Sequence, residues 1–252
     1  MSNTTRLGNT DLVNIAKQRF DKQQRSKLPS VIVNLPSGGA VYPNNHPLAS
    51  GTVEMRYMTA YDEDILTNIS YIREGVMFDK LLESLVISDI QIEDIASSDR
   101  DALIIAARIA AYGSEYPVEV TDPATNKPIK RVVDLKKIQP KEFALQPNDV
   151  GEFEYTLTDG KTTLYFTYNI NAVDFERVSD MLAVYITEVN GERSKERIEE
   201  FIRYEFLAGE AKRFRTFLTD NAPGLDYTYE FEGEAGGTFR ATFPIGTNLF
   251  WF

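Results

Sequence analysis

Two short runs of carboxylates are the residues best suited to do chemistry in this sequence. Asp62, Glu63 and Asp64 are consecutive, and Asp99 and Asp101 are two positions apart. Clustered carboxylates hold hard cations or act as general acids and bases. Neither run has the alternating ligand spacing of a calcium loop, however, and each falls in the first turn of an expected helix, where acids stabilise exposed backbone N–H groups. We interpret both runs as helix starts and predict no catalytic residue and no metal ligand.

The other residues that commonly build catalytic or cofactor sites are few. The single histidine, His46, lies in a loop of turn-forming residues, and one histidine alone makes neither a zinc site nor a catalytic triad. The absence of cysteine removes disulfides, thiolate metal sites and cysteine nucleophiles. The glycine-rich stretch at residues 36–39 lacks the spacing of a phosphate-binding loop. The sequence therefore predicts no cofactor and no small-molecule substrate.

Residues 122–128, DPATNKP, form a proline-flanked connection between two runs of alternating apolar and polar residues. The alternation predicts a β-hairpin over residues 113–135. A loop of this length between strands often holds a metal, but this one has no cysteine or histidine. It is either an ordinary turn or what remains of a site.

The composition is that of a soluble globular protein. Of the 252 residues, 42% are hydrophobic and 26% are charged, and the formal net charge is −11. A negative chain is a poor ligand for nucleic acids, whose binding depends on clustered Lys and Arg, and for anionic membrane surfaces. The longest apolar run is too short to span a bilayer, and the N-terminus lacks the apolar stretch of a signal peptide. We expect neither nucleic acid nor membrane as a partner.

The periodicity of apolar residues predicts an α+β fold. Thr59 is expected to cap a helix that ends at Gly75, a second helix follows over residues 76–86, and a third runs from Ser97 or Ser98 to Gly113. This third helix is apolar almost all round, so it should lie at the centre of the core. Further hairpins are expected over residues 153–170 and in the C-terminal tail, with helices between Val173 and Asp220.

We divide the chain into an N-terminal arm and helix (1–29), an α+β lobe (30–147) and a second α+β lobe that ends in an aromatic tail (148–252). In this scheme a central apolar helix and amphipathic helices pack with short antiparallel hairpins.

Two segments are predicted to bind a partner protein. The N-terminal helix has a narrow stripe, formed by Leu12, Ile15, Arg19 and Phe20, that gains little from packing on its own domain. A loosely held surface helix is an equally good interpretation of this pattern. The C-terminal Leu249, Phe250, Trp251 and Phe252 either fold into the core of the chain or fill a groove on a partner, and aromatic anchors favour the partner.

The sequence from VEMRYMTAYDEDILTN through VMFDKLLESLV to SSDRDALIIAARIAAYGSEYPVEVT resembles the baseplate hub assembly proteins of T4-like contractile-tailed bacteriophages. The resemblance rests on Met58–Leu66, on Asp99–Gly113 with its Arg108, and on the aromatic tail after Phe243–Pro244. Relatives of this kind carry a cysteine knuckle in the following hairpin, where this chain has Asp122–Thr125. A zinc site implied by the resemblance therefore fails here.

The resemblance implies a structural or assembly protein of the central baseplate hub, made in the host cytoplasm, present in the virion and bound to other tail or hub proteins. One alternative is a transient assembly chaperone that is absent from the mature particle. A tail-associated hydrolase that uses the carboxylate runs is a further alternative.

Overall fold

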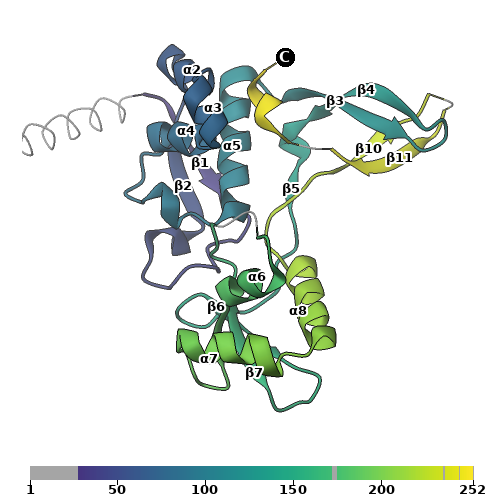
Figure 1. Ribbon diagram of the computed structural model, residues 1–252. Helices are drawn as coiled ribbons and strands as arrows, with labels where there is room; N and C mark the ends of the chain where they lie inside the picture. Colours follow the sequence, from purple (N-terminus) through teal and green to yellow (C-terminus); the bar gives the residue numbers. More distant parts are fainter. Residues whose placement is uncertain (1–27, 172–174, 235, 244, 252) are drawn as a thin grey trace, which may run out of the picture.

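The computed structural model describes residues 28–171, 175–234, 236–243 and 245–251, and it has the predicted α+β architecture. Figure 1 shows a first lobe that contains helices α2 to α5, an arm of two hairpins beside it, and a second lobe below. Within these described residues the strands pair in five small sheets, and every pairing between named strands is antiparallel.

The first lobe packs four helices against a two-stranded sheet. Strands β1 (Ser30–Asn34) and β2 (Thr52–Arg56) pair, and their connection contains the short 3₁₀ helix η1 (Pro47–Ser50). The helices are α2 (Ala60–Leu66), α3 (Ile69–Glu74), α4 (Met77–Leu85) and α5 (Ser97–Tyr112), with η2 (Ile92–Asp94) before α5.

The helix expected from Thr59 to Gly75 is instead two helices. Thr67 ends α2, and the side chain of Asn68 accepts hydrogen bonds from the Ser70 and Tyr71 N–H groups and thereby caps α3. Asn is a strong N-cap, so a second start inside one apolar pattern has a local cause. Gly75 ends α3 in the left-handed conformation, as predicted.

Helix α5 is the centre of the core, as its composition predicts. Leu103 is fully buried, Ile104, Ile105 and Ala107 are nearly so, and the helix also buries two charged side chains, Asp99 and Arg108. The predicted serine cap is wrong: the N-cap is Ala96, and Ser97 and Ser98 already belong to the helix.

The buried Asp99 ties the glycine-rich turn to the start of α5. Its carboxylate accepts hydrogen bonds from the Ser37 N–H (2.9 Å), the Ser37 hydroxyl (2.7 Å) and the Tyr42 hydroxyl (2.7 Å). Tyr42 in turn accepts from the N–H of Ala96, the cap residue. Burial raises the pKa of Asp99, and the hydrogen bonds from Tyr42 and Ser37 oppose part of this rise. The turn at residues 36–39 thus has a structural role in holding the helix start.

The arm consists of two hairpins that lie side by side (Figure 1). Strands β3 (Glu115–Asp122) and β4 (Lys127–Asp134) form the predicted first hairpin, and β10 (Thr228–Glu232) and β11 (Thr238–Thr242) form the second. Arg131 on β4 donates two hydrogen bonds to the Glu232 carbonyl on β10, at 2.9 and 2.6 Å. The first hairpin is followed by η3 (Leu135–Lys137).

The second lobe has a three-stranded sheet with helices on it. Strands β6 (Glu152–Thr156) and β7 (Thr163–Thr167) form the predicted hairpin, and β8 (Ile186–Val189) adds to β7. The helices are α6 (Val178–Tyr185), α7 (Lys195–Glu200), which continues as a π-helical turn over Phe201–Glu205, and α8 (Ala208–Asp220). Strand β8 lies where only helix was expected, and its pairing with β7 decides its conformation.

The last part of the chain returns to the first lobe and the arm. Strand β9 (Leu225–Asp226) pairs with β5 (Gln139–Pro140), so the outgoing and returning segments lie next to each other. After β10 and β11, the 3₁₀ helix η5 (Thr247–Phe250) contacts α5. The chain after α8 thus reaches the arm, where β10 pairs with β11, and the first lobe, where η5 packs on α5. Sequence order could not reveal this return, because it brings Leu225 beside Pro140 and Leu249 beside Arg108, residues that are far apart in the chain. The division of the chain after residue 147 stays a prediction.

Replacing Asp99 by alanine is expected to lower the free energy of unfolding by about 2–4 kcal/mol, because three buried donors lose their acceptor. Asp101, on the same helix, is exposed and accepts one hydrogen bond, from Tyr227. Asp101→Ala should therefore cost about 1 kcal/mol or less. Urea denaturation of the two variants measures the difference, and equal losses would contradict the role given to Asp99.

Candidate functional site

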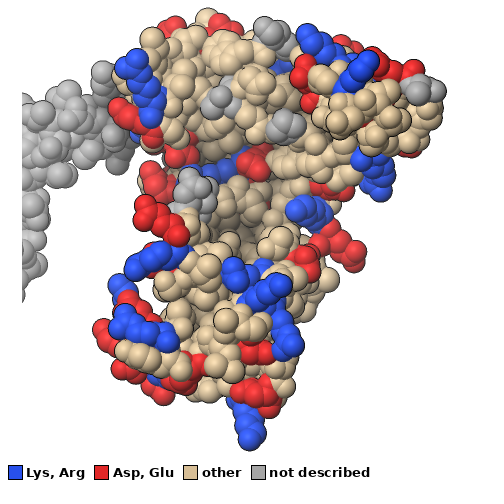
Figure 2. Space-filling view, turned by 45° about the vertical axis from the view of Figure 1, so that its right-hand side comes forward, with Lys and Arg blue, Asp and Glu red and all other residues tan. Residues whose placement is uncertain are grey.

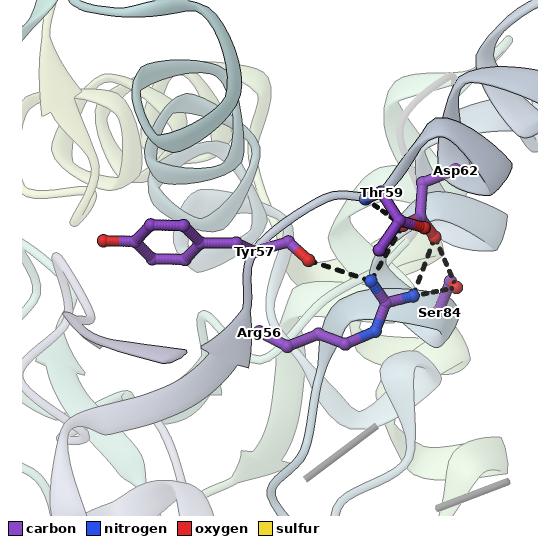
Figure 3. Close-up of polar contacts among 5 residues, drawn as sticks. All are labelled: Arg56, Tyr57, Thr59, Asp62 and Ser84. Atoms are coloured by element: carbon purple, nitrogen blue, oxygen red, sulfur yellow. Dashed lines mark hydrogen bonds and ion pairs between the residues drawn. The ribbon is translucent and has the colours of Figure 1, made fainter. Parts of the chain in front are cut away.

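Asp62, the central residue of the first acidic run, lies in a buried network between β2, α2 and α4 (Figure 3). Arg56 binds its carboxylate with two hydrogen bonds of 2.8 Å, and Ser84 donates to the same carboxylate at 2.7 Å. The Thr59 N–H and hydroxyl also donate to it, at 2.7 and 2.9 Å. Arg56 further donates to the Tyr57 carbonyl. The network therefore locks the entry into α2 to the sheet.

The electrostatics of Asp62 are those of a permanently charged structural group. Burial alone would raise its pKa, but the hydrogen bonds from Arg56, Thr59 and Ser84 outweigh this effect and lower the pKa to about 2. Both carboxylate oxygens already accept from these donors. A helix-start role was predicted for Asp62, whereas its ion pair with Arg56, six residues earlier, was not.

The remaining acids of the two runs are not brought together. Glu63 accepts a hydrogen bond from the Tyr112 hydroxyl at 2.8 Å, and Asp64 is exposed. Asp99 belongs to the turn network described above. Among the described residues, no group of three His, Cys, Asp or Glu side chains is arranged to hold a metal ion.

His46 caps a short helix. Its Nδ1 accepts from the Leu48 N–H at 3.2 Å, its ring stacks on Tyr42 with centroids 5.7 Å apart, and its Nε2 lies 3.6 Å from an Asp94 oxygen. These contacts hold the loop before η1 against the Tyr42–Asp99 network.

The DPATNKP loop joins the tips of the two hairpins of the arm. Asp122 is buried, and its carboxylate accepts from the Ala124 N–H (2.8 Å) within its own loop and from the Glu234 N–H (3.0 Å) of the other hairpin. These hydrogen bonds lower the pKa of Asp122. Gly233 permits the close approach, since a Cβ there would lie 3.3 Å from the Asp122 carboxylate. A carboxylate clamp thus connects the hairpin tips.

The aromatic tail packs largely into the chain itself. Leu249 and Phe250 are buried, and the Phe250 ring lies 6.2 Å from the rings of both Phe78 and Tyr112. Arg108, fully buried, donates to the Leu249 carbonyl at 2.9 Å. The prediction that Leu249 and Phe250 contact a partner is therefore corrected: the alternative, packing in the own core, holds for these two.

Other predicted partner contacts stay predictions. The side chain of Trp251 is 43% exposed. Phe252 lies outside the described residues, as do the N-terminal candidates, which are Leu12, Ile15, Arg19 and Phe20.

Exposed apolar side chains that the sequence did not single out lie on the first lobe. Ile69 and Ile72 of α3 are exposed, whereas Leu66 at the end of α2 is buried. The break between α2 and α3 turns the face of α3 outward, so that no residue of this helix is buried. Ile32, in the middle of β1, is also exposed.

The surface charges on the face shown in Figure 2 are of both signs and interspersed over both lobes and the arm. No helix of the described part of the chain is long and apolar enough to cross a membrane.

A comparison with protein families decides which class of protein this is. The family model described as T4 bacteriophage base plate protein matches residues 28–230. The chain belongs to this family. The match extends from the residues before β1 into β10, and so includes both lobes and the first hairpin of the arm of this base plate protein. Comparisons with curated proteins and with solved structures gave no match.

The Asp62 network makes the stability of the base plate protein depend on pH. A carboxyl whose pKa is lower in the folded than in the unfolded chain stabilises the fold above the unfolded value, about 4, and this contribution is lost as the pH falls towards 2. Asp62→Asn should therefore be less stable than wild type at pH 6, and the difference should shrink between pH 5 and 2. Denaturation at a series of pH values measures it. The exposed Asp64→Asn is the control, and the same pH dependence in both variants would contradict the assignment.

The Asp122 clamp predicts an arm that needs no metal. EDTA should leave the melting temperature of the wild-type protein unchanged, and added zinc should not raise it. Asp122→Ala should lower the melting temperature and speed amide exchange at Glu234, because that N–H loses its acceptor. Lys127→Ala, on the exposed side of the same loop, is the matched control. A zinc-dependent melting temperature would show that the loop has been misinterpreted.

Proposed function

We propose that this base plate protein is a structural or assembly component of the central hub of a contractile phage tail, and that it acts by binding other hub proteins without catalysis. Family membership supports a baseplate protein. The hub is inferred from the similarity of Met58–Leu66 and Asp99–Gly113 to hub assembly proteins. The tail baseplate of the virion is the corresponding location.

One observation supports a protein without catalytic activity. The two acidic residues that were the best catalytic candidates, Asp62 and Asp99, are engaged in hydrogen bonds that stabilise the fold. Asp62 is neutralised by Arg56, and Asp99 accepts only from Ser37 and Tyr42. Both side chains are fully buried. A substrate would have to displace these partners to reach either carboxylate.

The exposed apolar side chains support binding to protein partners. Ile32, Ile69 and Trp251 each expose more than two fifths of their surface. Apolar and aromatic side chains of this kind are typical anchors of protein interfaces. We propose Trp251 as a partner contact, together with Leu12, Ile15, Arg19 and Phe20 of the N-terminal segment.

Quantitative mass spectrometry of purified phage particles tests the role in the hub. We expect the chain at a fixed stoichiometry relative to the other hub proteins. Its presence in infected cells but absence from finished particles would instead identify a transient assembly factor. Absence of lysis in a peptidoglycan assay, for the wild type and for Asp62→Ala alike, is expected from a non-catalytic protein. Lysis by the wild type that Asp62→Ala abolishes would overturn the proposal.

A further inference from the structure

Strand β1 has one hydrogen-bonded edge and one open edge. The Tyr57 N–H donates to the Pro29 carbonyl and the Leu35 N–H to the Gly51 carbonyl, each at 2.8 Å, at the two ends of the β1–β2 pairing. Because hydrogen-bonded pairs alternate in an antiparallel ladder, Val31 and Val33 direct their N–H and C=O groups to β2. Ser30, Ile32 and Asn34 direct theirs away from β2. Among the described residues, these three have no backbone hydrogen-bond partner on that side.

A groove runs along this open edge. It has a volume of about 530 Å³, and its lining comes from β1, from one side of α5, and from η3 and β9. The side of α5 contributes Ala102, Ile105, Ala106 and Ile109, so small and aliphatic side chains form its floor. We call this feature the edge groove.

The open edge lacks the devices that usually protect edges from other strands. Natural edge strands carry charged side chains, prolines or bulges, or are covered by another element. Strand β1 reads Ser-Val-Ile-Val-Asn, without charge or proline, and pairs with β2 without a bulge. Its central side chain, Ile32, is 69% exposed. By contrast, the hairpin β10–β11 of the arm carries Glu230 opposite Arg240.

We propose that an extended segment of another baseplate protein binds the edge groove as a third strand beside β1. This inference rests on the proposed function and specifies the surface and the class of partner. The backbone of Ser30, Ile32 and Asn34 would supply hydrogen bonds to the added strand, and alternate side chains of that strand would enter the groove. This mode of recognition takes its affinity from main-chain hydrogen bonds and its specificity from the side-chain pockets.

The lining also selects the chemistry of the segment. Its residues are apolar except for Asn34 and Lys136, and Lys136 is its one charged side chain. The partner strand should therefore carry apolar residues at alternate positions, which would enter the groove. Near Lys136 it should carry a neutral or acidic residue, because a basic residue there would meet a like charge. The C-terminal aromatic tail of a second copy is a poor candidate, since Leu249 and Phe250 are already buried in their own chain.

The proposal makes a position-specific prediction for proline. Ile32→Pro removes an N–H that β2 does not use, so the variant should fold, as edge strands tolerate proline on the open side. Val33→Pro removes an N–H that does bond β2, and it should be clearly less stable. Ala106→Glu is a second, independent variant, which places a charged side chain on the partly exposed floor of the groove without altering β1. Circular dichroism and thermal melts establish which variants fold.

The test uses the tagged full chain in infected cells and quantifies the phage tail proteins recovered with it. Folded Ile32→Pro and Ala106→Glu should each reduce this recovery roughly tenfold or more, since loss of a hydrogen bond together with blocked packing changes affinity by at least this factor. Lys161→Glu, in the turn of the β6–β7 hairpin, should recover the same proteins as wild type. Recovery at wild-type level with both groove variants would overturn the strand proposal and leave the proposed function intact. Failure of the wild type to recover any tail protein would count against the proposed function itself.

Amide hydrogen exchange distinguishes a partner protein from two other occupants of the edge groove, which are residues 1–27 of the same chain and a second copy of the chain. The amides of Ile32 and Asn34 should exchange rapidly in the isolated chain and slowly in the recovered complex. Slow exchange in the isolated monomer would mean that residues 1–27 of the same chain cover the edge. Slow exchange that accompanies a doubled mass would identify a second copy. Either result would overturn the assignment to another protein.

Discussion

Two buried charged side chains of helix α5, Asp99 and Arg108, organise the protein. Asp99 lies in the first turn, and Arg108 lies one turn before the C-terminal end. The helix dipole favours a carboxylate in the first turn, which offsets part of the cost of removing Asp99 from water. Asp99 holds the glycine-rich turn through Ser37 and Tyr42. Arg108 donates to the carbonyls of Gly113, Glu115 and Leu249, and so joins the helix end, the start of β3 and the C-terminal segment.

This arrangement explains how residues far apart in the sequence form one body. Arg108 donates a hydrogen bond to the carbonyl of Leu249, which comes 141 residues later in the sequence. The segment that contains Leu249 follows the whole second lobe in the chain. The arm then depends on the same return, because β10 supplies the partner of Arg131 and the turn after β10 supplies a partner of Asp122. The Asp122 carboxylate connects the hairpin tips by accepting hydrogen bonds from the N–H groups of Ala124 and Glu234.

Local patterns in the sequence predicted most of the individual elements. The alternation in residues 113–135, the apolar content of α5 and the hairpin pattern of residues 153–170 each specify a structure within a short stretch of chain. The failures have identifiable causes. The cap at Asn68 divided one apolar pattern into two helices, and pairing with β7 made residues 186–189 a strand inside a segment expected to be helical. Local patterns also gave no sign that η5, near the end of the chain, packs on α5.

The sequence by itself determined the α+β class, the central helix, the hairpins, the absence of cysteine from the loop at residues 122–128 and, through the motifs at residues 58–66 and 99–113, the relationship to phage baseplate proteins. These properties depend on residue type and short-range periodicity. Only the tertiary structure decided which acids are buried and that Arg56 pairs with Asp62. It also decided that Arg108 binds the carbonyl of Leu249, that the aromatic tail is internal at Leu249 and Phe250, and that the outer edge of β1 is open. Burial, ion pairing and edge exposure depend on which distant segments come into contact. Short-range sequence patterns do not specify these long-range contacts.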